Sequence, residues 1–283
     1  MLINLQESDF DKYIDFAWVL GQDQTKSAYP TYTDGIKTKR DFVARERKAF
    51  SRENEEILLF EHNGQIEGWI HYRFESKSNY LDTCAFNVRT NMKLALEEFL
   101  SYVEDRFSGY ELYLGFPRSN TDAVSYLTEN DFTCIDESFH DVLFFDSYNL
   151  LPECSDVVAV TRDNFGDFRK LHRLVDEKMY WNCDRLFENL DDWHIYLCYR
   201  EGIAAGAIYY TDEKVMLEIF GVDFPNEVCN KEVLQVLLTR VLNEGKVAGA
   251  KYLCFFTDQD SHPVSLKLGF HFVGEYVCCW KKI

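Results

Sequence analysis

Glu218 has the surroundings of a residue that could take part in proton transfer. It interrupts an apolar run in VMLEIFGVDF, residues 215–224, whose composition predicts a strand. Burial disfavours the charged form of a carboxylate, so a buried Glu218 would be suited to act as a general base near neutral pH. A strand also has an outward face, and an ordinary solvent-exposed position for Glu218 is the alternative.

Aromatic and acidic residues are mixed in EKMYWNCDRLFENLDDW, residues 177–193. Tyr180 and Trp181 offer aromatic faces and Asp184 offers a carboxylate, which together could hold an organic cation. The formal net charge of −18 would also draw positively charged small molecules towards the protein. The segment therefore predicts a binding site for a small cationic amine, with core packing of an aromatic loop as the alternative.

The elements that must position these residues belong to a chain long enough for two domains. It has 283 residues, of which 46% are hydrophobic and can fill large cores. The acidic net charge argues against non-specific binding to nucleic acid, because neutralising phosphates requires a basic face. No apolar run reaches the roughly 18 residues of a membrane-spanning helix. We therefore expect neither nucleic acid nor membrane as a partner, and the oligomeric state is left open.

The cysteines and histidines show no spacing that predicts a disulfide framework or a metal site. The nine cysteines are an odd number without a C-x-x-C pair, and the seven histidines lack the spacing of metal ligands. The N-terminal segment MLINLQESDF lacks the basic and apolar regions of a signal peptide. These features predict a soluble protein of the reducing cytoplasm without a bound metal.

The sequence repeats itself at one constant interval. Gly64 and Gly202 are 138 positions apart. The same interval separates Gly68 from Gly206, Phe86 from Phe224, Leu96 from Leu234, Leu100 from Leu238, and Phe132 from Phe270. Chance matches between hydrophobic segments would scatter over several intervals, so the constant interval predicts a tandem duplication.

Each copy has the same predicted order of elements: helix, hairpin, third strand, long helix, fourth strand, short helix and last strand. The hairpins are expected at 57–74 and 195–210, and the third strands at 79–88 and 214–224. We predict an α/β (α+β) fold with two tandem domains, residues 1–148 and 156–283, each a mixed β-sheet flanked by helices. The segment SYNLLPECSD, residues 147–156, is the expected linker.

The phrase SHPVSLKLGF, which begins at Ser261, reads as a short helix ended by a glycine. Gly269 stands just past the last turn, where a left-handed conformation is favoured. Together with the element order, the phrase resembles the end of the GNAT N-acetyltransferase pattern, N-x-x-A-x-x-L-Y-x-K-x-G-F. A diverged copy begins at Asn120, with Asp131 in place of the glycine. The resemblance covers nearly the whole chain, twice, and implies two tandem GNAT-like domains.

The resemblance implies acetyl-CoA as co-substrate, held where the third strand of the second copy turns into the long helix. In such sites the backbone N–H groups of a helix N-terminus bind the diphosphate. The positions that match the family's binding positions are Val222, Phe224, Cys229, Asn230, Lys231, Asp258, Ser261 and Lys267. The match is incomplete, because no glycine lies between Gly221 and Gly245.

Acidic residues in this turn also oppose coenzyme binding. A carboxylate about 5 Å from a phosphate costs about 3 kcal/mol at an effective dielectric near 20, which is more than a hundredfold in affinity. Glu227 and Glu232 occupy the turn, while Lys231, or Arg89 in the first copy, could supply compensating charge. The second copy is the better candidate for a coenzyme site.

The resemblance further implies catalytic roles in the second copy. Glu218 matches a base on the third strand, and a backbone N–H at the end of that strand would stabilise the oxyanion. Ser265 stands where the family commonly has a tyrosine that acts as the acid. Tyr276 or Tyr210 could take that role, or could simply pack as aromatic side chains.

These observations favour an acetyl-CoA-dependent N-acetyltransferase that transfers an acyl group to the amine of a small, cationic acceptor. The second copy would be catalytic and the first structural. The alternative is a non-catalytic GNAT-derived binding or scaffold protein with decayed coenzyme sites, as the missing glycines suggest. An acyltransferase that uses aminoacyl-tRNA fits poorly with the net charge of −18.

Overall fold

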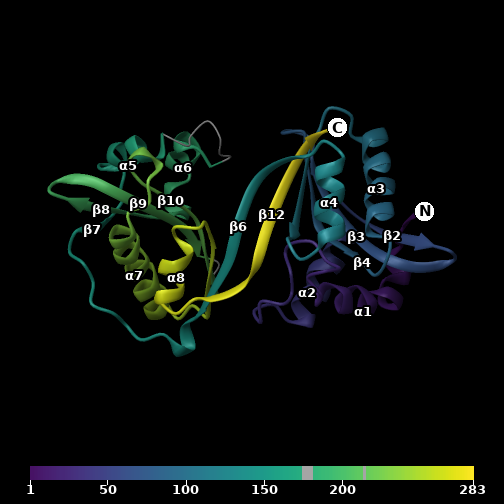
Figure 1. Ribbon diagram of the computed structural model, residues 1–283, viewed down its shortest axis with the longest axis horizontal. Helices are drawn as coiled ribbons and strands as arrows, with labels where there is room; N and C mark the ends of the chain where they lie inside the picture. Colours follow the sequence, from purple (N-terminus) through teal and green to yellow (C-terminus); the bar gives the residue numbers. More distant parts are fainter. Residues whose placement is uncertain (174–180, 213–214) are drawn as a thin grey trace. The chain divides into compact units, whose positions relative to one another are not determined.

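The computed structural model describes residues 1–173, 181–212 and 215–283 (Figure 1). The chain forms two compact units. Unit 1 consists of Met1–Ser138 and Gly274–Ile283, and unit 2 consists of Phe139–Val273. Within the described ranges, no helix is both long enough and apolar enough to cross a membrane.

Unit 1 is built on a mixed sheet. Its strands are β1 (Leu2–Asn4), β2 (Glu55–His62), β3 (Gln65–Glu75), β4 (Tyr80–Val88), β5 (Glu111–Pro117) and, from Gly274 onwards, β12 (His271–Lys282). Its helices are α1 (Phe10–Gly21), α2 (Lys39–Lys48), α3 (Met92–Arg106) and α4 (Thr121–Glu129). The strand order is β1-β2-β3-β4-β5-β12, in which β4 and β5 are parallel and the other neighbours antiparallel.

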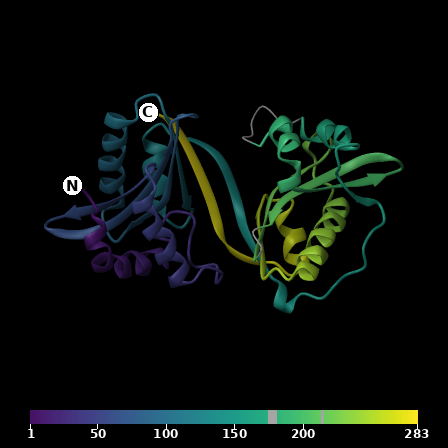
Figure 2. The same ribbon diagram turned by 180° about the vertical axis from the view of Figure 1, so that it is seen from behind.

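Two hydrophobic cores lie on opposite faces of this sheet, because successive side chains of a strand point to opposite sides. On β2, Leu58 and Phe60 pack with residues of α3 and α4. Ile57 and Leu59 pack instead with residues of α1 and α2. The sheet is therefore the middle layer between two pairs of helices (Figure 2).

Unit 2 repeats this arrangement. Its strands are β6 (Thr133–Phe144) from Phe139 onwards, β7 (Val157–Ala159), β8 (His194–Arg200), β9 (Ile203–Asp212), β10 (Met216–Asp223) and β11 (Tyr252–Thr257). Its helices are α5 (Phe165–His172), α6 (Cys183–Glu188), α7 (Lys231–Ala248) and α8 (His262–Lys267). The strand order is β6-β11-β10-β9-β8-β7, with β10 and β11 parallel.

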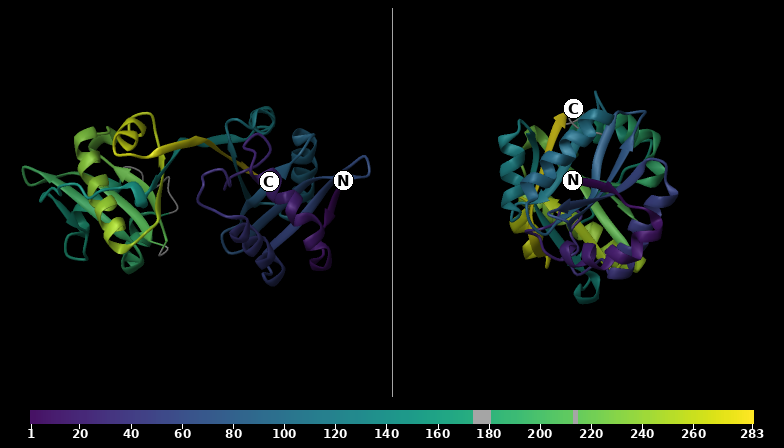
Figure 3. Two further views of the ribbon diagram at one scale, coloured as in Figure 1. Left: turned by 90° about the horizontal axis from the view of Figure 1, so that it is seen from below. Right: turned by 90° about the vertical axis from the view of Figure 1, so that its right-hand side faces the viewer.

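The two faces of the second sheet are covered by different helices. On β8, Tyr196 and Cys198 pack with α7 and α8, whereas Ile195 and Leu197 pack with α5 and α6. Figure 3 shows α7 against the strands of unit 2. The predicted fold, two tandem mixed sheets flanked by helices, is confirmed.

Backbone conformation repeats between the copies. The first hairpin turns through Asn63 and Gly64, whose φ values are 52° and 78°. The second turns through Glu201 and Gly202, with φ values of 52° and 78°. Two successive residues with positive φ form the two-residue turn that matches the twist of a hairpin. The interval of 138 therefore joins residues with the same local structure.

The glycine that ends α8 has the predicted left-handed conformation, with φ of 97° at Gly269. At the equivalent place after α4, Asp131 adopts φ of 60°. Asp tolerates this region better than most residues do, because its short side chain can hydrogen-bond locally. The diverged first copy thus keeps the helix stop without its glycine.

The last strand of each sequence copy pairs with a strand of the other copy. β6 ends the first copy, yet its residues from Phe139 to Phe144 pair with β11 of unit 2. β12 ends the second copy and pairs with β5 of unit 1. The compact units therefore differ from the predicted domains 1–148 and 156–283. The predicted domain boundaries followed the sequence repeat. A strand at the edge of a sheet can pair with any free strand edge, whatever its position in the sequence.

Candidate functional site

The parallel strands β10 and β11 of unit 2 separate after a short paired stretch. They pair over four positions, of which the last joins Ile219 to Phe255. Beyond Ile219, β10 continues to Asp223 beside β9, and no described residue pairs with its other edge in that stretch. The two strands form a wedge that opens towards their carboxyl ends.

Gly221 determines where the wedge begins. β10 bulges between Ile219 and Gly221. A Cβ atom at Gly221 would lie 2.2 Å from the hydroxyl oxygen of Tyr209, which is itself buried. Only a residue without a side chain leaves room for the Tyr209 ring here.

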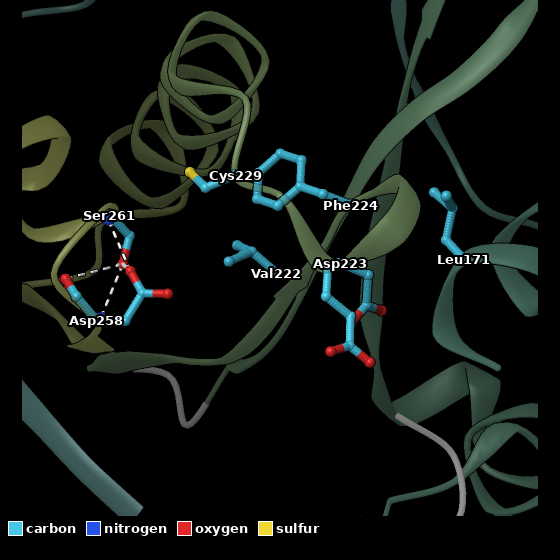
Figure 4. Close-up of a pocket in the computed structure, with 8 residues that line it drawn as sticks. Leu171, Val222, Asp223, Phe224, Cys229, Asp258 and Ser261 are labelled. Atoms are coloured by element: carbon cyan, nitrogen blue, oxygen red, sulfur yellow. Dashed lines mark hydrogen bonds between the residues drawn. The ribbon is translucent and has the colours of Figure 1, made fainter. Parts of the chain in front are cut away.

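A cavity of about 210 Å³ lies beside the separated strands (Figure 4). Its lining comes from α5, β10 and the loops that follow β10 and β11: Leu171, Val222, Asp223, Phe224, Glu227, Cys229, Asp258 and Ser261. Five of these residues, Val222, Phe224, Cys229, Asp258 and Ser261, occupy positions that the sequence pattern assigned to the coenzyme. The fold thus gathers residues from distant parts of unit 2 around one cavity.

Asp258 and Ser261 form a closed turn at the start of α8. The Ser261 hydroxyl donates to Asp258 Oδ1 at 2.6 Å, and the backbone N–H of Ser261 donates to the same oxygen at 2.7 Å. The backbone N–H of Asp258 donates to Ser261 Oγ at 2.9 Å. Figure 4 shows these bonds at the cavity wall. One oxygen of this carboxylate therefore holds the loop in shape.

The N-terminus of α7 is capped by its own side chain. Asn230 Oδ1 accepts hydrogen bonds from the backbone N–H groups of Glu232 and Val233, at 3.1 and 3.2 Å. These are first-turn amides of the kind that would hold a diphosphate. Lys231, next to the cap, forms an ion pair of 3.4 Å with Asp260. Two first-turn amides and the Lys231 side chain are thus already engaged within the protein.

The charge of the cavity is negative. Asp223, Glu227 and Asp258 line it, and none of its described lining residues is a lysine or an arginine. Such a lining attracts cations and repels a diphosphate. The cavity suits an uncharged or positively charged group.

A buried imidazole–carboxylate pair borders the cavity, and sequence reasoning missed it. His172 Nδ1 lies 2.9 Å from Asp223 Oδ2. His172 Nε2 lies 2.9 Å from the carbonyl oxygen of Trp181, and because a carbonyl only accepts, Nε2 carries a hydrogen. His172 is fully buried and Asp223 is 7% exposed. No motif links a histidine and an aspartate 51 positions apart, so only the fold reveals the pair.

The predicted catalytic residues are not gathered at the cavity. Glu218 is half-buried in the paired part of β10, and it does not line the cavity. Ser265 is fully buried, with its hydroxyl on the carboxylate of Asp141. Tyr276 lies on β12 opposite Pro117 of β5, which places it in unit 1. Tyr276 follows the second copy in sequence but belongs to unit 1, because β12 pairs with β5, and its catalytic role stays a prediction.

The remaining predicted residues show ordinary packing and surface contacts. Trp181 packs edge-on against Trp193 with 4.9 Å between ring centroids. Asp184 forms an ion pair with Arg169 at 2.9 Å, on the surface. Lys267 donates to Gln235 Oε1 at 3.0 Å. Tyr180 lies outside the described residues.

In unit 1 the parallel strands β4 and β5 also separate, but a segment of the chain lies between them. β4 and β5 are in parallel register only from Tyr80 to Asp82. Beyond that point, residues 26–29 of the same chain run between the strands. Ala28 N–H donates to the carbonyl oxygen of Phe86 on β4 at 3.1 Å, and Tyr29 N–H donates to that of Gly115 on β5 at 2.9 Å.

Comparison with known proteins identifies the fold. No protein-family model and no curated protein sequence matches the chain. Among solved structures, a GCN5-related N-acetyltransferase from Sphaerobacter thermophilus superposes with a TM-score of 0.64 at 11% identity, over 100% of this chain and 95% of its own. A tandem GNAT protein from the clavulanic acid biosynthesis pathway gives 0.52 at 12% identity, over 100% and 98%.

A third similar structure is larger than this chain. It is the GCN5-related glucosamine N-acetyltransferase region of a fungal multi-domain β-N-acetylglucosaminidase, with a TM-score of 0.60 at 8% identity. The match covers 99% of this chain and 38% of that one. At these identities the similarity shows the fold: two N-acetyltransferase-like units in tandem.

Proposed function

Starting from the tandem N-acetyltransferase fold, we propose that the protein transfers an acyl group from a thioester to the amine of a small, cationic acceptor, with unit 2 as the catalytic unit. One observation carries the proposal. β10 and β11 separate beside a cavity lined by five of the residues that the sequence assigned to the coenzyme. Parallel strands that part in this way leave room for an extended arm between them.

Acetyl-CoA is the donor that the fold implies, and its two halves fit unit 2 differently. The uncharged thioester arm suits a cavity with Val222, Phe224 and Cys229 in its wall. The diphosphate does not suit the N-terminus of α7, because Asn230 already takes two of its amides and Glu227 lies in the preceding loop. We therefore assign the arm, and not the diphosphate, to this site. When bound, the thioester supplies the activated acyl group.

Asp223 is the residue best placed to accept the proton that an ammonium must lose before it attacks. Its carboxylate lines the cavity. Oδ2 of that carboxylate lies 2.9 Å from Nδ1 of the buried His172. The hydrogen bond from His172 Nε2 to Trp181 leaves only Nδ1 to face Asp223. His172 acts as a positioning residue, since it orients the carboxylate.

The negative lining favours an acceptor that arrives as a cation. Asp223, Glu227 and Asp258 would attract an ammonium group and raise its local concentration. The glucosamine N-acetyltransferase region named above supports an amino sugar as one acceptor to test. We expect the reaction to occur in the reducing cytoplasm, since all nine cysteines are free thiols.

Calorimetric titration with acetyl-CoA and with S-acetylpantetheine tests the donor site. We expect both to bind at one site per chain, with affinities within about tenfold of each other. The reason is that Asn230 already occupies two of the α7 amides that would otherwise bind the diphosphate. Thiol release in the presence of polyamines or glucosamine then tests transfer. Absence of heat with either donor at millimolar concentration would rule out the proposal.

A non-catalytic binding role is the second candidate. The Asn230 cap and the acidic loop favour it, because both oppose the coenzyme that the fold implies. Binding of polyamines without any binding of the two thioesters would support this role. Turnover of either thioester would exclude it.

A further inference from the structure

Residues 26–29 occupy the wedge of unit 1 in the manner of an added strand. The carbonyl oxygen of Lys26 accepts from Val88 N–H at 2.8 Å, and Ala28 N–H donates to the carbonyl oxygen of Phe86 at 3.1 Å. Residues two apart on the segment thus bond to residues two apart on β4, in opposite order. This is the pattern of an antiparallel pair.

The segment is tied to the other side of the wedge as well. Tyr29 N–H donates to the carbonyl oxygen of Gly115 on β5. The carbonyl oxygen of Ser27 accepts from the side-chain amide of Asn120, which caps α4, at 3.3 Å. The short peptide therefore bridges two strands and a helix cap that would otherwise be apart.

Side chains complete the fit. Ala28 is 1% exposed and belongs to the hydrophobic core between the sheet and α3. The Tyr29 ring meets the Tyr276 ring edge-on, with 4.7 Å between centroids. A Cβ atom at Gly115 would lie 2.7 Å from that Tyr276 ring, so only glycine admits it. The wedge accommodates a small residue followed by an aromatic one.

We infer that the wedge of unit 1 is a binding site for an extended peptide strand, and that residues 26–29 of the same chain occupy it permanently. The segment uses backbone groups of β4 and β5 that any ligand arm between these strands would need. Unit 1 therefore holds no acyl donor, and the chain has one donor site. The occupancy of the wedge by residues 26–29 does not depend on the proposed function. The statement that the chain has one donor site does rest on the proposed function.

Complementation with a peptide tests this inference. In the full chain, residues 24–29 are replaced by a Gly/Ser linker of equal length, and a synthetic peptide of residues 22–33 is added. We expect the linker to lower the Tm of unit 1 by about 5–10 °C and the peptide to restore it. The same peptide with an N-methyl group on Ala28 is the control, because it lacks the N–H that donates to Phe86, and it should not restore the Tm. A linker variant with the parental Tm would overturn the inference.

Hydrogen exchange on the unmodified chain gives a second readout, which decides the matter if the linker variant does not fold. The amides of Ala28, Tyr29 and Val88 should exchange at least about a thousandfold more slowly than free peptide amides. Saturating acetyl-CoA should leave them unchanged. Exchange within seconds, or release by acetyl-CoA, would contradict permanent occupancy. Failure of acetyl-CoA to bind would count against the proposed function and would not affect this protection.

Discussion

The two wedges show how one fold element can serve different purposes in two copies of a unit. In unit 1 the parting strands β4 and β5 are bridged by residues 26–29, which belong to the core. In unit 2 the parting strands β10 and β11 border a cavity of about 210 Å³. The strands themselves differ little. Among the residues that the structure describes, the segment 26–29 after the first helix of unit 1 is the feature that distinguishes the filled wedge from the one that borders a cavity.

Each unit also buries an imidazole beside carboxylates, and the contrast is similar. In unit 1, His71 lies 3.1 Å from both Glu46 and Glu55, and all three side chains are buried. In unit 2, the partner of His172 is Asp223, which lines the cavity. Buried charge alone does not mark a functional site; access to a ligand does.

Removing the carboxylate at the cavity gives the largest expected effect. Asp223→Asn should lower kcat by about 10²–10⁴-fold, because the amide cannot accept the proton, while the affinity for S-acetylpantetheine stays the same. Glu218→Gln is the matched comparison, since Glu218 lies outside the cavity. Should E218Q lose turnover while D223N retains it, the base is Glu218 and the geometric assignment fails.

Removing the imidazole of unit 1 should affect stability and not chemistry. His71→Gln leaves Glu46 and Glu55 buried without their cation, which we expect to cost about 3–5 kcal/mol in the free energy of unfolding. His194→Gln, at an exposed position of unit 2, is the control and should change stability by less than about 0.5 kcal/mol. Denaturant unfolding measures both. A stable H71Q protein would show that the cluster does not hold unit 1 together.

The same cluster predicts a pH dependence with a definite sign. Burial alone lowers the pKa of His71, but Glu46, Cys84 and Glu55 together raise it well above the ordinary value. The hydrogen bond from His71, helped by Arg52, lowers the pKa of Glu55 to about 2. The stabilisation that protonated His71 adds to the free energy of unfolding is therefore complete below about pH 6.5. It is lost as the pH rises through the raised pKa of His71. Stability measured from pH 6 to 10 should fall in the parent more steeply than in H71Q.

A side chain at the start of the second wedge should disturb unit 2 alone. Gly221→Ala places a Cβ against the Tyr209 hydroxyl, and we expect a loss of about 1–3 kcal/mol together with weaker donor binding. Gly166→Ala is the control, because nothing lies within 4 Å of its Cβ position and a helix favours alanine. Equal stability of the two variants would mean that Tyr209 can move aside, and that Gly221 does not set the wedge.

The smallest effect concerns the cap of α7. Asn230→Ala should cost about 1 kcal/mol of stability, because two amides lose their acceptor. The freed amides should also raise the affinity for acetyl-CoA relative to S-acetylpantetheine. Asn182→Ala removes a comparable cap from α6, where Asn182 accepts from Arg185 N–H at 3.0 Å, and should cost stability without changing donor preference.

The repeat and the element order could be predicted because they depend on local rules, and five lining residues of the cavity could be predicted because their positions match the GNAT pattern. Paired glycines mark equivalent turns, and the residues just after a strand and just before a helix meet at one sheet edge. The residues that were missed depend on tertiary contacts. His172 and Asp223 come together only when α5 packs on the sheet, and residues 26–29 carry no motif that predicts insertion between strands. The position of Tyr276 depended on strand exchange, which a repeat cannot reveal.

That exchange has a consequence for how the chain can be made. The edge strand of unit 1 belongs to residues 274–283, which a ribosome synthesises after all of unit 2. The half of the protein that is translated first is therefore the half that is finished last. Until residues 274–283 emerge, β5 exposes an unpaired edge, and a premature stop before residue 274 would damage the N-terminal half of the molecule.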